Sequence, residues 1–140
     1  MKSSAQTMSA FMAGSMIAAD GTTDVTARLT YQPRDPYAIT VTITDRTGAV
    51  QVWTIERDLL LSGLTAQASC PAGRHRVRLW TCQHHNGLSL MIAMMASFVA
   101  FLELNLERVA DFAIGTLQLV PQGQEPGQLN LDAELERLTA

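Results

Sequence analysis

The chain has 140 residues, of which 47% are hydrophobic and 16% are charged, and its formal net charge at pH 7 is −3. A chain of this length can bury a core of its own, and this apolar content excludes an intrinsically disordered protein. The small negative charge argues against a general polyanion-binding protein. We therefore expect a single domain over residues 1–140, with residues 1–8 flexible and no signal peptide.

Four strands are expected in the first half of the chain, at residues 11–18, 25–31, 37–44 and 50–56. In the third of these, apolar side chains alternate with threonines, and β-branched residues stand on both faces. The sequence Asp45-Arg46-Thr47-Gly48 has the composition of a turn, so the third and fourth strands are expected to form a hairpin.

The segment after the fourth strand predicts a short helical turn at residues 57–62, with Gly63 as its C-cap. Asp58 stands at the start of this turn, where a carboxylate can accept hydrogen bonds from unpaired backbone N–H groups. Arg57 can then reach a neighbouring carboxylate, and the two leucines after Asp58 are expected to pack under the sheet. We interpret this unit as mainly structural.

Two further strands are expected at residues 74–81 and 88–95, on either side of an Asn-Gly turn. One face of the first carries three arginines, Arg74, Arg76 and Arg78. Three guanidinium groups on one face could follow the phosphates of a single-stranded nucleic acid, but no aromatic side chains stand between them. The other interpretation is an exposed face whose charges discourage edge pairing. Trp53 and Trp80 both lie in alternating strands, so we expect them to be core anchors.

The spacing of apolar residues becomes helical from about Ser97, which predicts a long helix over residues 98–114 with Ser97 as N-cap and Gly115 at its end. One face of this helix would carry acids, including Glu103 and Glu107. These two acids and the three arginines are the candidates for a partner-binding surface.

The opposite side of the predicted helix is more apolar than one sheet face can cover, so we expect it to form an oligomer interface. The residues of that candidate interface are Phe98, Phe101, Leu104 and Phe112. A linker at residues 122–129 should follow, and then a short C-terminal helix that Asn130 caps.

The chain offers little support for chemistry. Cys70 and Cys82 form no C-x-x-C motif and are too few for a disulfide scaffold, so we expect reduced thiols and a cytoplasmic protein. The adjacent residues His84 and His85 would point to opposite faces of a strand and could not easily share a metal ion. No nucleotide-binding, hydrolase or zinc-protease motif occurs. We expect no enzymatic activity, no cofactor, no metal site and no membrane span, since the uncharged stretch 87–102 is too short.

Several motifs, in order along the chain, resemble the SsgA-like family of actinobacterial sporulation and cell-division regulators. The family patterns D-P-Y-A-V and W-x-F-x-R-D-L-L-x-x-G-L are matched at Asp35, Pro36, Tyr37, Trp53, Arg57, Asp58, Leu59, Leu60 and Gly63. A G-D-V-R-V-W pattern resembles the segment ending at Trp80, and a V-P-x-G turn and an acidic tail resemble residues 120–123 and 130–135. Arg76 stands where the family usually has an acid, which marks a divergent member.

The resemblance implies a whirly-like α+β fold, with antiparallel sheets of six to seven strands followed by a long helix and a short C-terminal helix, assembled as a homotrimer. It implies a non-enzymatic scaffold of cell division or sporulation septation, recruited to division sites. The implied partners are the tubulin-like division protein FtsZ, an FtsZ-associated protein or another SsgA-like protein. Whirly-type relatives bind single-stranded nucleic acid, which is the alternative function. The α+β class also follows from the residues, because period two precedes Met95 and a helical period follows it.

Overall fold

The computed structural model describes residues 6–73, 76–84, 87–95 and 99–127. These residues form one seven-stranded sheet in the order β4-β3-β2-β1-β7-β6-β5, and every neighbouring pair is antiparallel. The strands are β1 (Met8–Ala18), β2 (Gly21–Tyr31), β3 (Ala38–Asp45), β4 (Val50–Glu56), β5 (Val77–His84), β6 (Gly87–Met95) and β7 (Val99–Asn105). The helices are α1 (Arg57–Gly63) and α2 (Leu106–Leu119). The predicted class, antiparallel strands followed by a helix, is confirmed.

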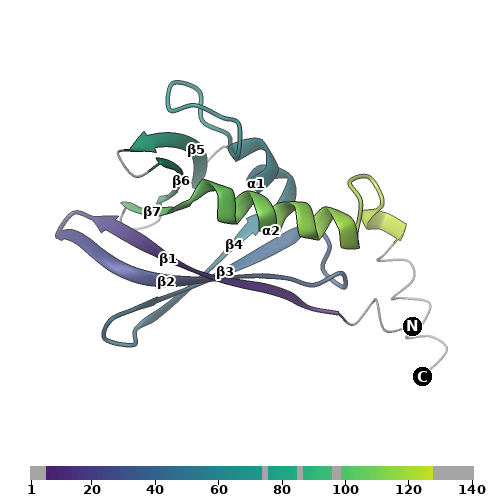
Figure 1. The fold of residues 1–140 in the computed structure, drawn as a ribbon, viewed down its shortest axis with the longest axis horizontal. Helices are drawn as coiled ribbons and strands as arrows, with labels where there is room; N and C mark the ends of the chain where they lie inside the picture. The colour runs from purple at the N-terminus through teal and green to yellow at the C-terminus, as the bar shows by residue number, and fades with distance from the viewer. Residues whose placement is uncertain (1–5, 74–75, 85–86, 96–98, 128–140) are drawn as a thin grey trace.

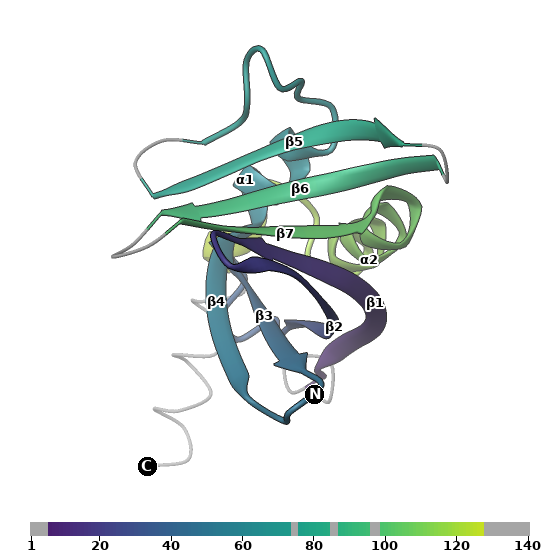
Figure 2. The same cartoon turned by 90° about the vertical axis from the view of Figure 1, so that its left-hand side faces the viewer.

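The sheet is strongly curled, and its two parts meet at β1 (Figure 2). We call β1–β4 the first part and β5–β7 the second part. β1 pairs with β2 along its whole length but with β7 only over residues 14–17. Gly14 permits this junction, because a Cβ there would stand 2.7 Å from Leu104 Cδ2 and 2.9 Å from the carbonyl oxygen of Glu103. A larger residue would therefore force the two parts of the sheet apart.

The core lies on the inner face of the curled sheet. In β3, Ile39, Val41 and Ile43 are each 2% exposed or less, and the threonines between them face outward. In β4, Trp53 and Ile55 are buried on the same inner side, as the alternation predicts. Period-two sequence thus translates directly into one buried and one solvated face.

Helix α2 lies across the inner face and closes the curl (Figure 1). Its buried side includes Val109, Phe112 and Ala113, and it contacts β1, β6 and β7. The Arg108 side chain donates from Nη2 to the carbonyl oxygen of Phe11 at 2.9 Å. This bond satisfies a backbone acceptor of β1 in the stretch that β7 does not reach.

The predicted helix after the strands is present, but its predicted bounds, residues 98–114, are wrong. Residues 99–105 form β7, in which Ala100, Leu102 and Leu104 are buried on the inner face. The sequence pattern does not reveal the alternation over this stretch, because Leu102 and Leu106 also have helical spacing. The helix begins only at Leu106, and its cap is Asn105, whose side chain accepts from the backbone N–H of Arg108 at 3.0 Å. The predicted cap, residue 97, lies outside the described residues.

Two glycine predictions also need correction. Gly63 is the last residue of α1 rather than a left-handed cap, because the cap is Leu64 in right-handed helical conformation. What Gly63 provides is space, since a Cβ there would stand 2.5 Å from Leu79 Cβ on β5. Gly115 does not end α2, which continues to Leu119.

The segment after α2 turns back onto the molecule. Residues 125–127 are helical and Glu125 is 4% exposed, although this stretch was predicted to be a linker. The expected C-terminal helix capped by residue 130 lies outside the described residues.

Candidate protein-interaction surfaces

Arg57 lies at the centre of the fold and is 1% exposed. Its Nη1 donates to the hydroxyl of Tyr31 at 3.1 Å. The same nitrogen donates to two carbonyl oxygens at the end of α2, that of Thr116 at 3.1 Å and that of Val120 at 2.6 Å. Nη2 forms a buried salt bridge of 2.7 Å with Glu125 Oε2. One guanidinium group therefore joins α1 and β2 to the end of α2 and to the segment that follows it.

The surroundings of this guanidinium fix the protonation of its partners. The pKa of Glu125 is lowered from its ordinary value by a hydrogen bond from its own backbone N–H and then by the Arg57 guanidinium. The N–H of Gly123 also donates to Glu125 Oε1, at 2.8 Å. Burial raises the pKa of Tyr31, so its hydroxyl keeps its proton and donates to the carbonyl oxygen of Pro36 at 3.1 Å. At neutral pH the network thus holds one ionised carboxylate against one guanidinium.

The other signature residues surround this network. The carbonyl oxygen of Tyr37 accepts the N–H of Arg57 at 2.7 Å, and Asp35 stands in the turn just before β3. Leu60 is 1% exposed and Leu59 packs against the core. The role expected for Asp58 needs correction, because α1 has no side-chain cap and Asp58 Oδ1 instead accepts from Gln122 Nε2 at 3.1 Å. The signature residues therefore lie at the joint between α1, β2 and the end of α2.

Sequence reasoning predicted a carboxylate near Arg57 but did not find which one. Composition alone predicts a linker at residues 122–129, so the sequence does not identify Glu125 as the partner of Arg57. The available signal was the turn at residues 120–123, which reverses the chain after α2 and brings the next acid back toward α1. Tyr31 ends the strand predicted at residues 25–31, and nothing in that pattern marks its hydroxyl as a partner of Arg57.

The structure does not gather the predicted charged candidates into one surface. Arg76 precedes β5 and is exposed, whereas Arg78 lies half-buried on the outer face of β5, where its Nη1 donates to the carbonyl oxygen of Val77 at 3.3 Å. Glu103 is half-buried on β7, and Glu107 is exposed in the first turn of α2. The expected acidic helix stripe is therefore divided between a strand and a helix. Arg74 lies outside the described residues.

The outer face of the second part carries a continuous group of apolar side chains. Trp80 on β5 and Phe101 on β7 meet edge to face, with ring centroids 6.3 Å apart and planes at 77°. Ala93 on β6, opposite Phe101 in the register, is fully buried. We name this group the apolar outer face, and it consists of Trp80, Met91, Ala93, Met95, Val99 and Phe101. The prediction that Trp80 is a core anchor is wrong, because it stands half-buried on this outer side.

The candidate oligomer interface must be redrawn in consequence. Leu104 is 1% exposed and Phe112 is 2% exposed, both within this chain's own core. Neither can therefore contact a second copy while the domain is folded. Phe101 keeps its place because it belongs to the apolar outer face, and Phe98 lies outside the described residues.

The outer face of the first part differs in composition from that of the second part. It is dominated by exposed or half-buried threonines, namely Thr26, Thr30, Thr40, Thr42, Thr44 and Thr54. Its exposed large apolar side chains are Val50 and Val52 at the β4 edge and Phe11, which is 61% exposed and has the guanidinium carbon of Arg28 5.6 Å from its ring centroid.

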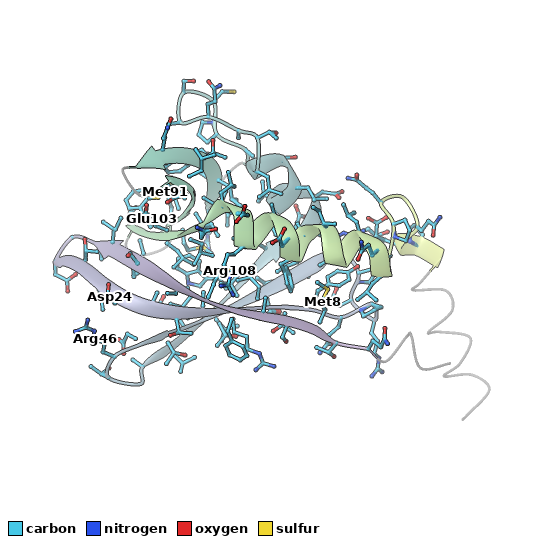
Figure 3. The ribbon with its side chains drawn as sticks, viewed as in Figure 1. Met8, Asp24, Arg46, Met91, Glu103 and Arg108 are labelled. Carbon is cyan, nitrogen blue, oxygen red and sulfur yellow. The ribbon has the colours of Figure 1, made fainter. Side chains whose placement is uncertain are left out.

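A hollow of about 750 Å³ lies where the two parts of the sheet meet. Its lining includes Ser15, Asp24, Ser89, Glu103 and Asn105. Figure 3 shows Asp24 and Glu103 on different strands, and Asp24 is already paired with Arg46 at 2.8 Å.

Among the described residues, no group of three or more histidine, cysteine or acidic side chains could hold a metal ion. In the same part of the chain no helix is long and apolar enough to cross a membrane. Cys70 and Cys82 are free thiols.

Comparison with known proteins gives a consistent answer. The family model described as Streptomyces sporulation and cell division protein SsgA matches residues 25–125. The chain belongs to the SsgA family. It is 36% identical over 117 residues to the sporulation-specific cell division protein SsgB of Frankia casuarinae, covering 81% of this chain and 78% of that protein. It is 32% identical over 128 residues to SsgB of Streptomyces coelicolor, covering 89% of each.

Solved structures agree. The crystal structure of an SsgA-like sporulation-specific cell division protein from Thermobifida fusca matches with a TM-score of 0.87 at 27% identity, covering 98% of each chain. A structure from a study of SsgB mutations and longitudinal cell division during sporulation of Streptomyces coelicolor matches with a TM-score of 0.79 at 28% identity, covering 88% of this chain and 95% of that one. The SsgA-like assignment made from the sequence motifs is confirmed, and with it the fold.

Proposed function

We propose that this protein is a non-enzymatic regulator of sporulation septation that is recruited to division sites and binds the division machinery, either FtsZ or an FtsZ-associated protein. The observation that carries this proposal is membership of a family of sporulation and cell division proteins over residues 25–125. The relatives at 36% and 32% identity are both named sporulation-specific cell division proteins.

The same proposal includes a homotrimer held by the apolar outer face of β5–β7. Contiguous apolar surface usually marks an interface, whereas single exposed apolar residues do not. Tryptophan and phenylalanine, here Trp80 and Phe101, are enriched at protein interfaces, and tryptophan is among the residues that contribute most binding energy. A second SsgA-like protein could occupy the same face in place of an identical copy.

Binding of single-stranded nucleic acid is the alternative, and the described residues give it less support than the sequence did. A phosphate-tracking ladder needs its arginines side by side on one strand face. Here Arg76 lies before β5, and Arg78 is half-buried beside the carbonyl oxygen of Val77.

One paired titration separates these readings. The purified protein is titrated against FtsZ and, separately, against labelled single-stranded DNA at near-physiological salt. We expect FtsZ or a division complex containing it to respond and DNA not to respond. DNA binding that falls steeply with salt and is lost when Arg74, Arg76 and Arg78 are changed together, without an FtsZ response, would overturn the proposal.

A further inference from the structure

β4 leaves one edge of the sheet open. Arg57 donates to the carbonyl oxygen of Tyr37 at 2.7 Å, and Asp45 donates to that of Ala49 at 3.0 Å. These two bonds fix the phase of the β3–β4 ladder, so the odd-numbered residues of β4 form the hydrogen-bonded pairs with β3. The backbone N–H and C=O groups of Val50, Val52 and Thr54, and the N–H of Glu56, must then point away from β3. The C=O of Glu56 is not part of this open edge, because Glu56 is the N-cap of α1 and its carbonyl accepts the first bond of that helix. Within the described residues no backbone hydrogen bond involves that outer edge.

The opposite edge of the sheet is covered. The N–H and C=O of Leu79 on β5 both bond to Ala72, at 2.9 and 2.8 Å. Further along β5, the backbone N–H and the hydroxyl of Thr81 both donate to the carbonyl oxygen of Ala66, at 2.9 and 3.0 Å. The loop after α1 therefore occupies the β5 edge, and among the described residues the free sheet edge is that of β4.

The sequence of β4 lacks the usual protection of an edge strand. Natural edges are commonly blocked by proline, by lysine or arginine, or by a bulge. The strand reads Val-Gln-Val-Trp-Thr-Ile-Glu, and its pairing with β3 is continuous from Val50 to Glu56. Val50 and Val52 are 57% and 62% exposed on the outer face, next to the open backbone groups. An added strand would find both hydrogen-bond partners and apolar contacts here.

A small acidic pocket lies at the end of this edge. It has a volume of about 150 Å³ and is lined by Tyr37, Glu56, Arg57, Asp58 and Glu125. The Arg57 and Glu125 charges compensate each other in their salt bridge, so the carboxylates of Glu56 and Asp58 leave the lining negative. Tyr37, which is 43% exposed, adds an aromatic ring that a cation can approach.

We propose that the open edge of β4 binds an extended segment of a partner protein as an added antiparallel strand, with a lysine or arginine opposite Glu56. Side chains opposite each other in an antiparallel pair share a face. The bound segment therefore begins at its N-terminus with a basic residue, which is followed by any residue. Small apolar residues then occupy every second position, opposite Thr54, Val52 and Val50. Backbone bonds supply the affinity, and the alternate side chains supply the specificity.

The choice of a different protein over a second copy rests on the proposed trimer. Pairing of β4 with another β4 relates two chains by a two-fold axis, which cannot close a ring of three. Pairing of β4 with the β5 of a neighbour is blocked by the loop that carries Ala66 and Ala72.

The test uses the full chain and a capped synthetic peptide, Lys-Ser-Val-Ser-Val-Ser-Val, followed by amide NMR. Saturable shifts are expected at the amides of Val50, Val52, Thr54 and Glu56, which should also exchange rapidly with solvent in the free protein. The same peptide with N-methylated valines cannot donate to β4 and should not bind. No shifts at β4 with millimolar peptide, or protection of these amides before peptide is added, would overturn the proposal.

Two variants and a charge-matched control sharpen the result. Val52→Pro removes an outward N–H without removing a bond to β3, so it should fold and lose the peptide response. Glu56→Lys should weaken binding of the lysine peptide roughly threefold and favour a peptide with glutamate in that position. Asp111→Lys, an equal change of charge on α2, should leave both affinities unchanged. Equal binding by the proline and parent chains would contradict the proposal.

The light-scattering mass of Val52→Pro keeps this inference separate from the proposed function. An unchanged mass is expected, and a changed mass would show that the edge belongs to an interface between copies, which would contradict the inference. Failure of the protein to form a trimer or to bind a division protein would appear without any peptide present.

Discussion

The two parts of the curled sheet share one core but present opposite outer faces. The first part, β1–β4, shows threonines to solvent, and the Arg28 guanidinium lies over the ring of its exposed Phe11. The second part, β5–β7, shows apolar side chains that touch one another, with Trp80 against Phe101. The strands pair in regular antiparallel ladders in both parts, so strand pairing does not require the apolar outer face. We infer that the face of the second part is maintained for contact with another chain.

Arg57 ties β2 of the first part to the end of α2, and α2 is the helix that packs against both parts of the sheet. Arg57→Met should lower the free energy of unfolding by about 3–5 kcal/mol, because it leaves the Glu125 carboxylate buried without its partner. Trp53 reports on the first part and Trp80 on the second, so single-tryptophan versions can follow each part in urea. We expect coincident transitions for both, shifted together by the substitution.

The double variant Arg57→Met with Glu125→Gln is the matched control. It removes the uncompensated charge and should recover part of the loss. Separate transitions for the two tryptophans would show that the two parts are independent domains. That result would contradict the view that they fold as one unit.

Leu60→Ala tests the packing between α1 and the core. Leu60 is 1% exposed, so its truncation should cost roughly 2–5 kcal/mol, seen as a lower melting temperature. Leu59→Ala, at a partly buried position on the same helix, should cost less. An unchanged melting temperature for the Leu60 variant would show that the signature residues are not structural.

The smallest effect concerns pH. The pKa of Glu125 is lowered in the folded protein, so the stabilisation from its ionised form is complete above the ordinary glutamate pKa of about 4.3 and is lost as the pH falls through the folded value. Glu125→Gln should therefore be less stable than the parent at pH 7, and the difference should shrink below about pH 4. Urea unfolding at several pH values measures it. A difference that stays constant down to pH 3 would assign the loss to packing rather than to charge.

The sequence predicted the first part of the sheet more successfully than the second. Alternation in β3 is unambiguous because Ile39, Val41 and Ile43 alternate with threonines, and in β4 Trp53 and Ile55 stand two residues apart on the buried side. β7 failed because both of its faces are largely apolar, so period two is concealed and the spacing of Leu102 and Leu106 imitates a helix. The apolar outer face that hid this strand is the same feature that sets the second part apart.

The candidate site was likewise only partly predictable from the sequence. The structural role of Arg57, Leu59 and Leu60 could be predicted, because the leucines of a short helical turn must be buried against a neighbouring element. The partner of Arg57 could not be identified, since Glu125 is 68 residues away and only the return of the chain after α2 brings it near. The interface residues Leu104 and Phe112 were wrong because they were assigned to one long helix.

The central claim is that the outer face of β5–β7 is the interface, and two phenylalanines test it as a matched pair. Phe101 lies in the apolar outer face, and Phe11 lies exposed on the outer face of the first part. The mass of Phe101→Ser and of Phe11→Ser is measured by light scattering at micromolar concentration beside the parent chain. We expect a trimer for the parent chain and for the Phe11 variant, and dissociation of the Phe101 variant. A monomeric parent, or dissociation of the Phe11 variant alone, would contradict the account.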